Sequence, residues 1–312
     1  MGLTLGVFCE DREPKSFKQV REVTTEEYAD YKKAVRTLLR LPTDKERFQD
    51  VLVAFVEYMD VVADHEDFLR ESRHVNGAVL KRELNTRLSN YLRAIRSFVD
   101  HSDKALSDRY GADSDERRTF RRATNEVYDK SFSYRMLEQA RNYTQHVGEA
   151  IEHISYGWRA LDPETRSSEP YLDIEFARDK FLEWKKLKAS FRKELAEQPE
   201  RIPVTTHVQQ VTGCIRYLDT VFIAQQVDDL VHAAKHVMDV IAPLEGTMGR
   251  PVFYTFEAPE LAVGERGNFS LQADWIPADL ARFVLESHEQ VQSDKEVSQE
   301  DTSPTESVLP ED

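Results

Sequence analysis

The six residues from Arg141 to His146 include three side chains that could do chemistry on a phosphate ester. Histidine titrates near neutral pH, so His146 could act as a general acid or base. A guanidinium binds phosphate and offsets negative charge in a transition state, which is the role expected of Arg141. Asn142 lies four residues before His146, on the same face of a helix, where it could orient the histidine or the phosphate. The spacing therefore makes Arg141, Asn142 and His146 the catalytic candidates.

A basic segment precedes this motif in an otherwise acidic chain. The 312 residues include 42 Lys and Arg against 57 Asp and Glu, for a net charge of −15, yet residues 70–141 hold 16 basic and 11 acidic residues. A local site for a polyanion has this composition. We expect the substrate to contact Arg96, Arg117, Arg118, Arg121, Arg122 and Gln145. The alternative is that the arginines neutralise acidic neighbours within the fold.

Helical periodicity predicts the elements that position these residues. Apolar residues three and four apart predict a long helix over 75–106, a polar helix over 114–130 and a helix over 134–158 that carries the motif in its first half. Thr24 and Glu27 form a capping box for an earlier helix, which ends at Pro42. Two further helices are expected over 171–197 and 205–241, and two strands over 252–256 and 269–275. Few glycines and many Glu, Arg, Leu and Ala residues agree with a mainly helical protein.

The motif resembles the R-N-x-x-x-H signature of the HEPN superfamily, a group of helical-bundle domains that includes many metal-independent endoribonucleases. The order of a long helix, a basic segment and the motif also matches, over roughly residues 75–160. The resemblance implies a dimer in which two motif-bearing helices line one cleft. It also implies attack of an RNA 2′-hydroxyl on the adjacent phosphodiester, which leaves a 2′,3′-cyclic phosphate. The bare Arg-x4-His spacing occurs a second time, at Arg96 and His101, without the asparagine.

Other candidate sites carry weaker signals. His232 and His236 lie one helical turn apart, but the sequence offers no catalytic glutamate between them and no obvious third ligand. Cys9 and Cys214 are too few for a thiolate metal cage. The sequence patterns of serine hydrolases, dinucleotide-binding enzymes and P-loop NTPases do not occur. We therefore expect neither a metal nor a cofactor.

Together these patterns predict a mainly α protein with four parts. An N-terminal helical segment (1–72) packs on a HEPN-like multi-helix bundle (73–160), followed by a helical region with a small β-hairpin (171–286) and a disordered acidic tail (287–312). No apolar run is long enough to span a membrane and the start lacks the pattern of a signal peptide, so a cytoplasmic location is expected.

We expect a dimeric, RNA-cleaving enzyme, of the kind that the resembled family uses in toxins and antiviral defence, with RNA as its substrate and a regulatory protein as a further partner. The alternative is a non-catalytic helical module. In that case the same residues stabilise a homodimer or bind a nucleotide or a partner protein.

Overall fold

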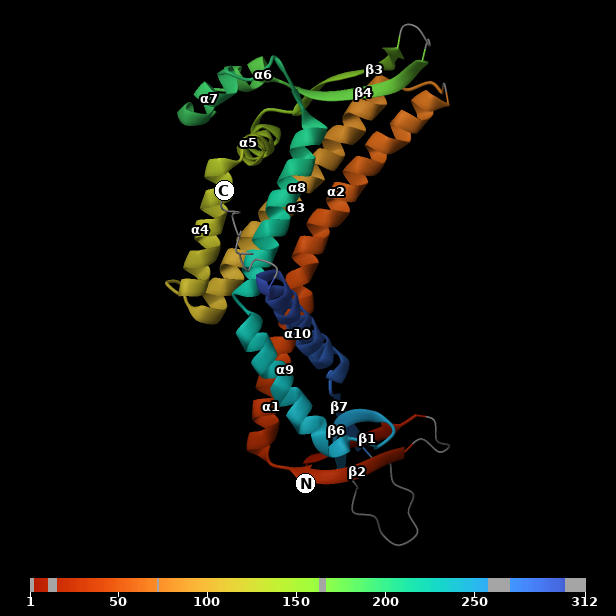
Figure 1. Ribbon diagram of the computed structural model, residues 1–312, viewed down its shortest axis with the longest axis vertical. Coiled ribbons are helices and arrows are strands. Elements are labelled where there is room, and N and C mark those ends of the chain that lie inside the picture. Colours follow the sequence, from red (N-terminus) through yellow and green to blue (C-terminus); the bar gives the residue numbers. More distant parts are fainter. Residues whose placement is uncertain (1–2, 11–15, 72, 163–166, 258–269, 301–312) are drawn as a thin grey trace, which may run out of the picture. The chain divides into compact units, whose positions relative to one another are not determined.

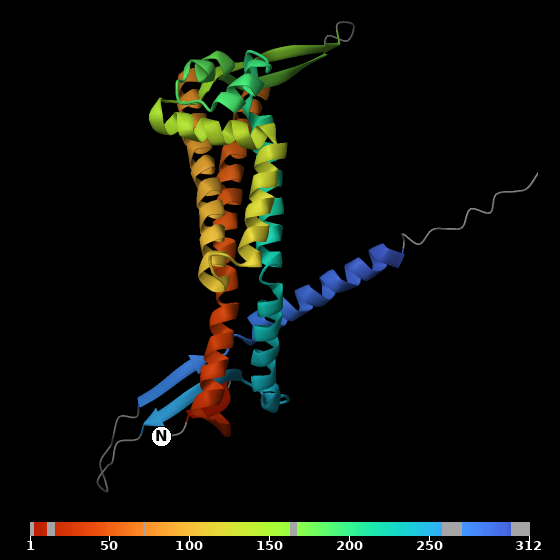
Figure 2. The same ribbon diagram turned by 90° about the vertical axis from the view of Figure 1, so that its left-hand side faces the viewer.

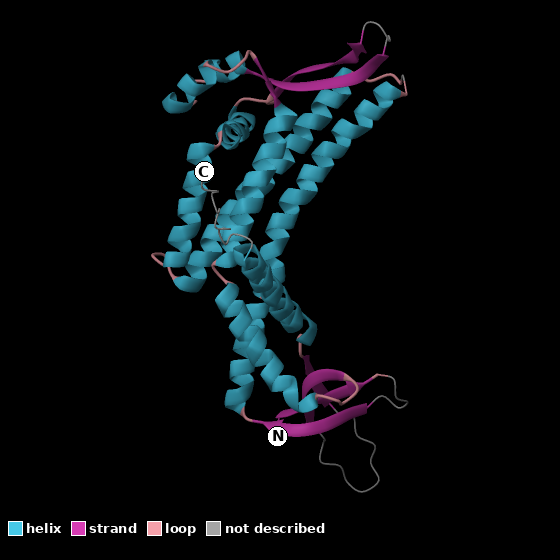
Figure 3. Cartoon of the chain, viewed as in Figure 1, coloured by secondary structure: helices cyan, strands magenta, loops and turns pink. Residues whose placement is uncertain are grey.

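The computed structural model describes residues 3–10, 16–71, 73–162, 167–257 and 270–300. The chain is mainly helical, as predicted, with two small antiparallel sheets (Figure 1, Figure 3). It divides into two compact units, one made of residues 1–42 and 226–312 and the other of residues 43–225. Within the described ranges no helix combines the length and the apolar character that crossing a membrane requires.

The unit of residues 43–225 contains three long helices that run side by side (Figure 1, Figure 2). These helices are α2 (Arg40–Arg70), α3 (Gly77–Tyr110) and α8 (Val204–Ala224). Its other elements are α4 (Asp115–Lys130), α5 (Phe132–His146), β3 (Ile151–Asp162), β4 (Ser167–Ala177), α6 (Arg178–Glu183), α7 (Ala189–Ala196) and β5 (Arg201–Pro203). Strands β3, β4 and β5 form an antiparallel sheet in that order.

The core of this unit lies along α3. The apolar stripe predicted for the long helix is buried, including Leu84, Leu88 and Phe98, which have no exposed surface. Tyr91 is equally buried, and its hydroxyl donates to the Val208 carbonyl at 3.0 Å, which ties α3 to α8. Burial of such a stripe stabilises a helix far more than its intrinsic propensity does.

Serine side chains set the boundaries of the two shorter helices. Ser114 accepts a hydrogen bond from the Arg117 amide and begins α4. Ser131 follows the last residue of α4, and its hydroxyl accepts from the Tyr134 amide, which begins α5. These caps satisfy amides that have no partner inside the helix.

The prediction of one helix over residues 134–158 is wrong, because α5 ends at His146 and the chain continues as strand β3. From Ile154 to Trp158 apolar and small or polar residues alternate, which is the period of a strand rather than of a helix. The first part of the helix expected over 171–197 is also a strand, because β4 runs from Ser167 to Ala177. The helix predicted over 205–241 is also two helices, since α8 ends at Ala224.

The second unit combines a four-stranded antiparallel sheet with three helices. Its elements are β1 (Leu3–Cys9), β2 (Ser16–Val23), α1 (Thr25–Leu38), α9 (Val227–Ile241), the 3₁₀ turn η1 (Ala242–Leu244), β6 (Arg250–Glu257), β7 (Ser270–Trp275) and α10 (Ala278–Glu300). The strand order is β2-β1-β6-β7. The predicted capping box of Thr24 and Glu27 is present at the start of α1.

The strands expected near residues 252–256 and 269–275 pair with each other as β6 and β7, and β6 also pairs with β1. The acidic tail, expected to be disordered from residue 287, is helical as far as Glu300, and residues 301–312 lie outside the described residues. Its Glu, Gln and Lys residues are good helix formers, which explains the extension of α10. The boundaries of the two units differ from those of the four expected parts. Residues 43–72 belong to the same unit as residues 73–225, and residues 1–42 belong to the same unit as residues 226–312.

Candidate functional site

Helix α5 turns one face to the core and leaves the motif at its edge. Ala140 has no exposed surface, and Tyr143 packs its ring 4.7 Å from that of Phe181. Arg141 and Asn142 are half-buried, whereas Gln145 and His146 are exposed. The buried side chains fix the orientation of α5, so the motif stands on a rigid element.

Arg141 lies beside a small cavity together with Arg96 and Glu138. Its Nη1 donates to Asn142 Oδ1 at 3.4 Å, while its Nε is buried without a hydrogen-bond partner. Glu138 Oε2 is likewise buried and unpartnered. The cavity has a volume of about 40 Å³, which is room for a water molecule, since one needs roughly 10–15 Å³. Unpaired buried polar atoms of opposite charge next to a cavity are a site where a polar ligand atom can bind.

The same cavity is lined by Tyr134, and the surrounding charges act on its hydroxyl. Burial, and then the nearby carboxylate of Glu138, raise the pKa of Tyr134 to about 12. Arg96 is paired with Asp100 at 2.8 Å, but both side chains are about half exposed. An exposed pair of this kind is weak, so Arg96 can exchange Asp100 for another anion at little cost.

His146 stands apart from this cavity at the C-terminal end of α5. Its side chain is exposed and makes no hydrogen bond or ion pair with any other residue that the structure describes. A helix turns by roughly 100° per residue. His146 therefore lies about 40° from Asn142 around the helix and about 140° from Arg141. The side chains of Arg141 and Asn142 are therefore hydrogen-bonded to each other. His146 lies one helical turn after Asn142, toward the C-terminal end of α5, and is exposed to solvent.

The arginines expected to bind substrate on α4 are largely engaged within the unit. Arg117 and Arg121 each make two hydrogen bonds to the carboxylate of Asp103, at 2.7–3.0 Å. The hydrogen bonds from Arg117, and then those from Arg121, hold the pKa of Asp103 well below its usual range. Arg118 pairs with Asp115 at 2.5 Å.

Among the described residues Arg122 has no ion-pair partner and is exposed. The alternative stated for the basic segment, neutralisation by acidic neighbours, thus describes Arg117, Arg118 and Arg121. Of the expected set, Arg122 and Gln145 are exposed, and Arg96 is held only by an exposed ion pair. Arg118 and Arg121 are paired but keep more than half of their side-chain surface exposed.

Asn85, which sequence analysis did not single out, fixes the chain just after the motif. Its Oδ1 accepts from the Ile151 amide at 2.9 Å, and its Nδ2 donates to the Ile151 carbonyl at 3.2 Å. The asparagine thereby imitates a neighbouring strand and holds the first residue of β3 against α3. Glu138 was also missed, although it lies three residues before Arg141, a spacing that places both on one helix face.

A serine–histidine contact also joins α5 to α8. Ser133 Oγ lies 2.7 Å from Nδ1 of His207, and it donates to the side chain of Gln210. Burial lowers the pKa of His207, and Ser133 is only 4% exposed. A nucleophile needs access to its substrate, so this pair is a structural link between the helices.

Neither the histidines nor the cysteines considered from the sequence gather into a ligand set. His232 is exposed on α9 and His236 is half-buried. Cys9 Sγ donates to the Met248 carbonyl at 3.5 Å. Over the described ranges no three His, Cys, Asp or Glu side chains are grouped so that they could hold a metal ion.

Comparison of the chain with protein-family models, with curated proteins and with solved structures finds no match.

Proposed function

We propose that this protein is a metal-independent endoribonuclease whose active site contains Arg141, Asn142 and His146. The observation that carries the proposal is that, among the described residues, these side chains make no hydrogen bond or ion pair to another helix or strand. Within the described residues, the side chains of Arg141 and Asn142 hydrogen-bond only to each other, and the side chain of His146 makes no hydrogen bond. A purely structural polar layer would be paired across elements, as Ser133 and His207 are.

In the proposed reaction the RNA 2′-oxygen attacks the adjacent phosphorus. A general base removes the 2′-hydroxyl proton, the bond between phosphorus and the 5′-oxygen breaks, and a general acid gives that oxygen a proton. The products are a 2′,3′-cyclic phosphate and a 5′-hydroxyl. His146 is exposed and able to transfer protons, while Arg141 supplies the positive charge that offsets the developing charge on the phosphoryl oxygens.

One histidine can serve as either the base or the acid in a given step, and the reaction needs both. A second copy of the chain would supply the other histidine if two α5 helices met around a two-fold axis. Val147, directly after His146, is 53% exposed and provides an apolar residue for such a contact. The dimer is therefore part of the proposal.

RNA contacts in this proposal come from accessible groups near α5. Arg96 beside Arg141, the exposed Gln145 and the unpaired Arg122 are the candidates. Because Asp103 holds Arg117 and Arg121, we expect few released counterions and therefore a shallow dependence of RNA affinity on salt concentration.

The test is cleavage of end-labelled RNA in the presence of EDTA by the wild type and by Arg141→Ala and His146→Ala. We expect both variants to fold normally and to lose cleavage by about 10²-fold or more, the range of general acid–base catalysis. His101→Ala is the matched control, because His101 is also exposed and follows an arginine at the same spacing. Equal cleavage by wild type and His146→Ala, or loss in His101→Ala alone, would contradict the assignment.

A second candidate function, a non-catalytic interaction module, is favoured by the β3–β4 hairpin. One face of the hairpin carries Ile154, Tyr156 and Trp158 paired with Ile174, Leu172 and Pro170. The Tyr156 hydroxyl donates to the Val75 carbonyl, whereas Trp158 is 50% exposed. If Trp158→Ala abolishes self-association of a protein that cleaves no RNA, the module is the better account.

A further inference from the structure

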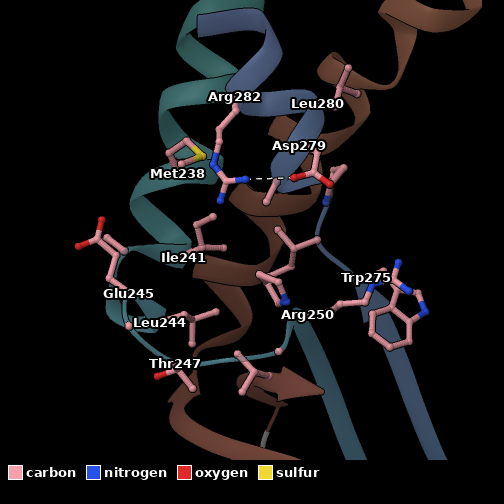
Figure 4. A pocket seen from close by; sticks show the side chains of 18 residues that line it. Met238, Ile241, Leu244, Glu245, Thr247, Arg250, Trp275, Asp279, Leu280 and Arg282 are labelled. Carbon is pink, nitrogen blue, oxygen red and sulfur yellow. Dashed lines mark hydrogen bonds and ion pairs between the residues drawn. The ribbon is translucent and has the colours of Figure 1, made fainter. Parts of the chain in front are cut away.

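A second, larger cavity lies within the unit of residues 1–42 and 226–312 (Figure 4). Its volume of about 780 Å³ falls within the range of about 300–1,000 Å³ that small-molecule sites occupy. Buried apolar side chains contribute to its lining: Val7, Ile241, Leu244 and Ile276 are each less than a tenth exposed. The proposed ribonuclease site belongs to the other unit and does not use this cavity.

Two arginines from different elements line the cavity. Arg282 of α10 bends toward Asp279 of the same helix, and Arg250 of β6 lies against the indole of Trp275 (Figure 4). The Arg282–Asp279 pair measures 3.0 Å, but Asp279 is fully exposed and Arg282 is 53% exposed. Such a pair contributes little to stability, so Arg282 is free to bind another anion. Glu245 directs its carboxylate away from the other side chains (Figure 4).

Trp275 gives one wall of the cavity a flat aromatic surface. The guanidinium of Arg250 lies 4.8 Å from its ring, and Arg250 also pairs with Glu10 at 3.2 Å. Trp275 is 43% exposed, so part of its large apolar ring is in contact with solvent. Because Arg250 lies over one face of this ring, a flat ligand ring stacks on the guanidinium or on the other face of the indole.

The cavity therefore combines the volume of a small-molecule site, an arginine and an exposed indole. Ligands smaller than a nucleotide would use only part of this set. An inorganic anion would leave the exposed indole uncovered, and an uncharged apolar molecule would leave Arg282 without an anionic ligand. The first turn of α10, which includes Asp279 and Leu280, also lines the cavity, and amides at the start of a helix favour an anion there.

We infer that this cavity binds a nucleoside phosphate, with the phosphate at Arg282 and the base against Trp275. This inference is independent of the proposed ribonuclease activity. It concerns binding alone and assigns no reaction to the cavity.

The experiment is isothermal titration calorimetry of the full chain with AMP, ADP and ATP, with adenosine and inorganic phosphate as separate probes. We expect saturable binding of at least one nucleotide, and weaker binding of both adenosine and phosphate. Arg282→Gln should weaken nucleotide binding by about tenfold or more, because it removes a charge-assisted hydrogen bond. Arg36→Gln is the matched control, since Arg36 is an exposed helix arginine of the same unit that does not line the cavity.

Tryptophan fluorescence tests whether the nucleotide binds in this cavity. The chain has three tryptophans, so Trp158→Phe combined with Trp184→Phe leaves Trp275 as the single reporter. Nucleotide binding should change the Trp275 emission with the same dissociation constant as calorimetry gives. The inference is overturned if no nucleotide binds at millimolar concentration, if adenosine binds as tightly as AMP, or if Arg282→Gln, with unchanged circular dichroism, binds like the wild type.

Discussion

Replacement of Asn85 by alanine tests how the chain after the motif is held in place. Asn85 is 6% exposed and bonds both backbone groups of Ile151, a residue with no exposed surface. Alanine would leave a buried N–H and a buried C=O without partners, at about 1–3 kcal/mol each. Alanine is a better helix former than asparagine and returns roughly 0.5 kcal/mol. The net loss in the free energy of unfolding is therefore about 1.5–5.5 kcal/mol.

A loss of this size is readily measured. For a unit of about 180 residues, each kcal/mol lowers the melting temperature by about 2–4 °C, so Asn85→Ala should melt about 3–22 °C lower. Urea unfolding followed by fluorescence in a Trp275→Phe background reports on this unit alone, because Trp158 and Trp184 both belong to it.

Two further variants separate hydrogen bonding from volume. Asn85→Asp keeps the size of the side chain but removes the donor to the Ile151 carbonyl, so it should be destabilising as well. Asn90→Ala changes an exposed asparagine of the same helix and should stay within about 0.5 kcal/mol of the wild type. If Asn85→Ala were as stable as Asn90→Ala, the explanation given for the start of β3 would be refuted.

Other predictions concern the charged contacts and one glycine. The pKa of Asp103 is held low by its arginines, so its ionised form stabilises the fold above about pH 4 and this contribution is lost as the pH falls further. Thermal melts should therefore show a steeper loss of stability below about pH 4 in the wild type than in Asp103→Asn, and equal slopes would count against the pairing. Arg135→Ala should lower the free energy of unfolding, measured in urea, by about 2 kcal/mol. Glu194→Gln should lower it less, because in that variant the guanidinium keeps its backbone carbonyl acceptors. Gly249 has φ +131° and no room for a Cβ, so Gly249→Ala should lower stability by about 1–3 kcal/mol, and more than Gly246→Ala, whose Cβ meets open space. The melting temperatures of the two glycine variants provide that comparison.

The spacing of apolar residues was sufficient to predict the helices that bury one face and expose the other. The stripe from Leu80 to Val99 in α3 and the capping box at Thr24 follow from local residue pattern, and both are present. The alternating residues 154–158 also carried a strand signal. The spacing of three and four residues that predicted a helix over 134–158 concealed it, because short apolar runs satisfy both periods.

Long-range contacts could not be predicted in the same way. The arginines of α4 suggested a surface for a polyanion, yet their partner Asp103 precedes Arg117 by 14 residues and lies on another helix. The hydrogen bonds of Asn85 span 66 residues, and nothing in its local sequence distinguishes it from an ordinary buried polar residue. The cavity at Arg250 and Arg282 joins residues from both ends of the chain, so no single segment of the sequence indicates it.

The chemistry of the RNA ends tests the central claim most directly. Purified wild-type protein is incubated with labelled RNA in EDTA, and the termini of any products are identified by mass spectrometry. The proposed site predicts 2′,3′-cyclic phosphate and 5′-hydroxyl ends, produced by the wild type and absent with His146→Ala. Products with 3′-hydroxyl and 5′-phosphate ends, or intact RNA in the presence of a folded dimer, would contradict the assignment of Arg141 and His146 as catalytic residues.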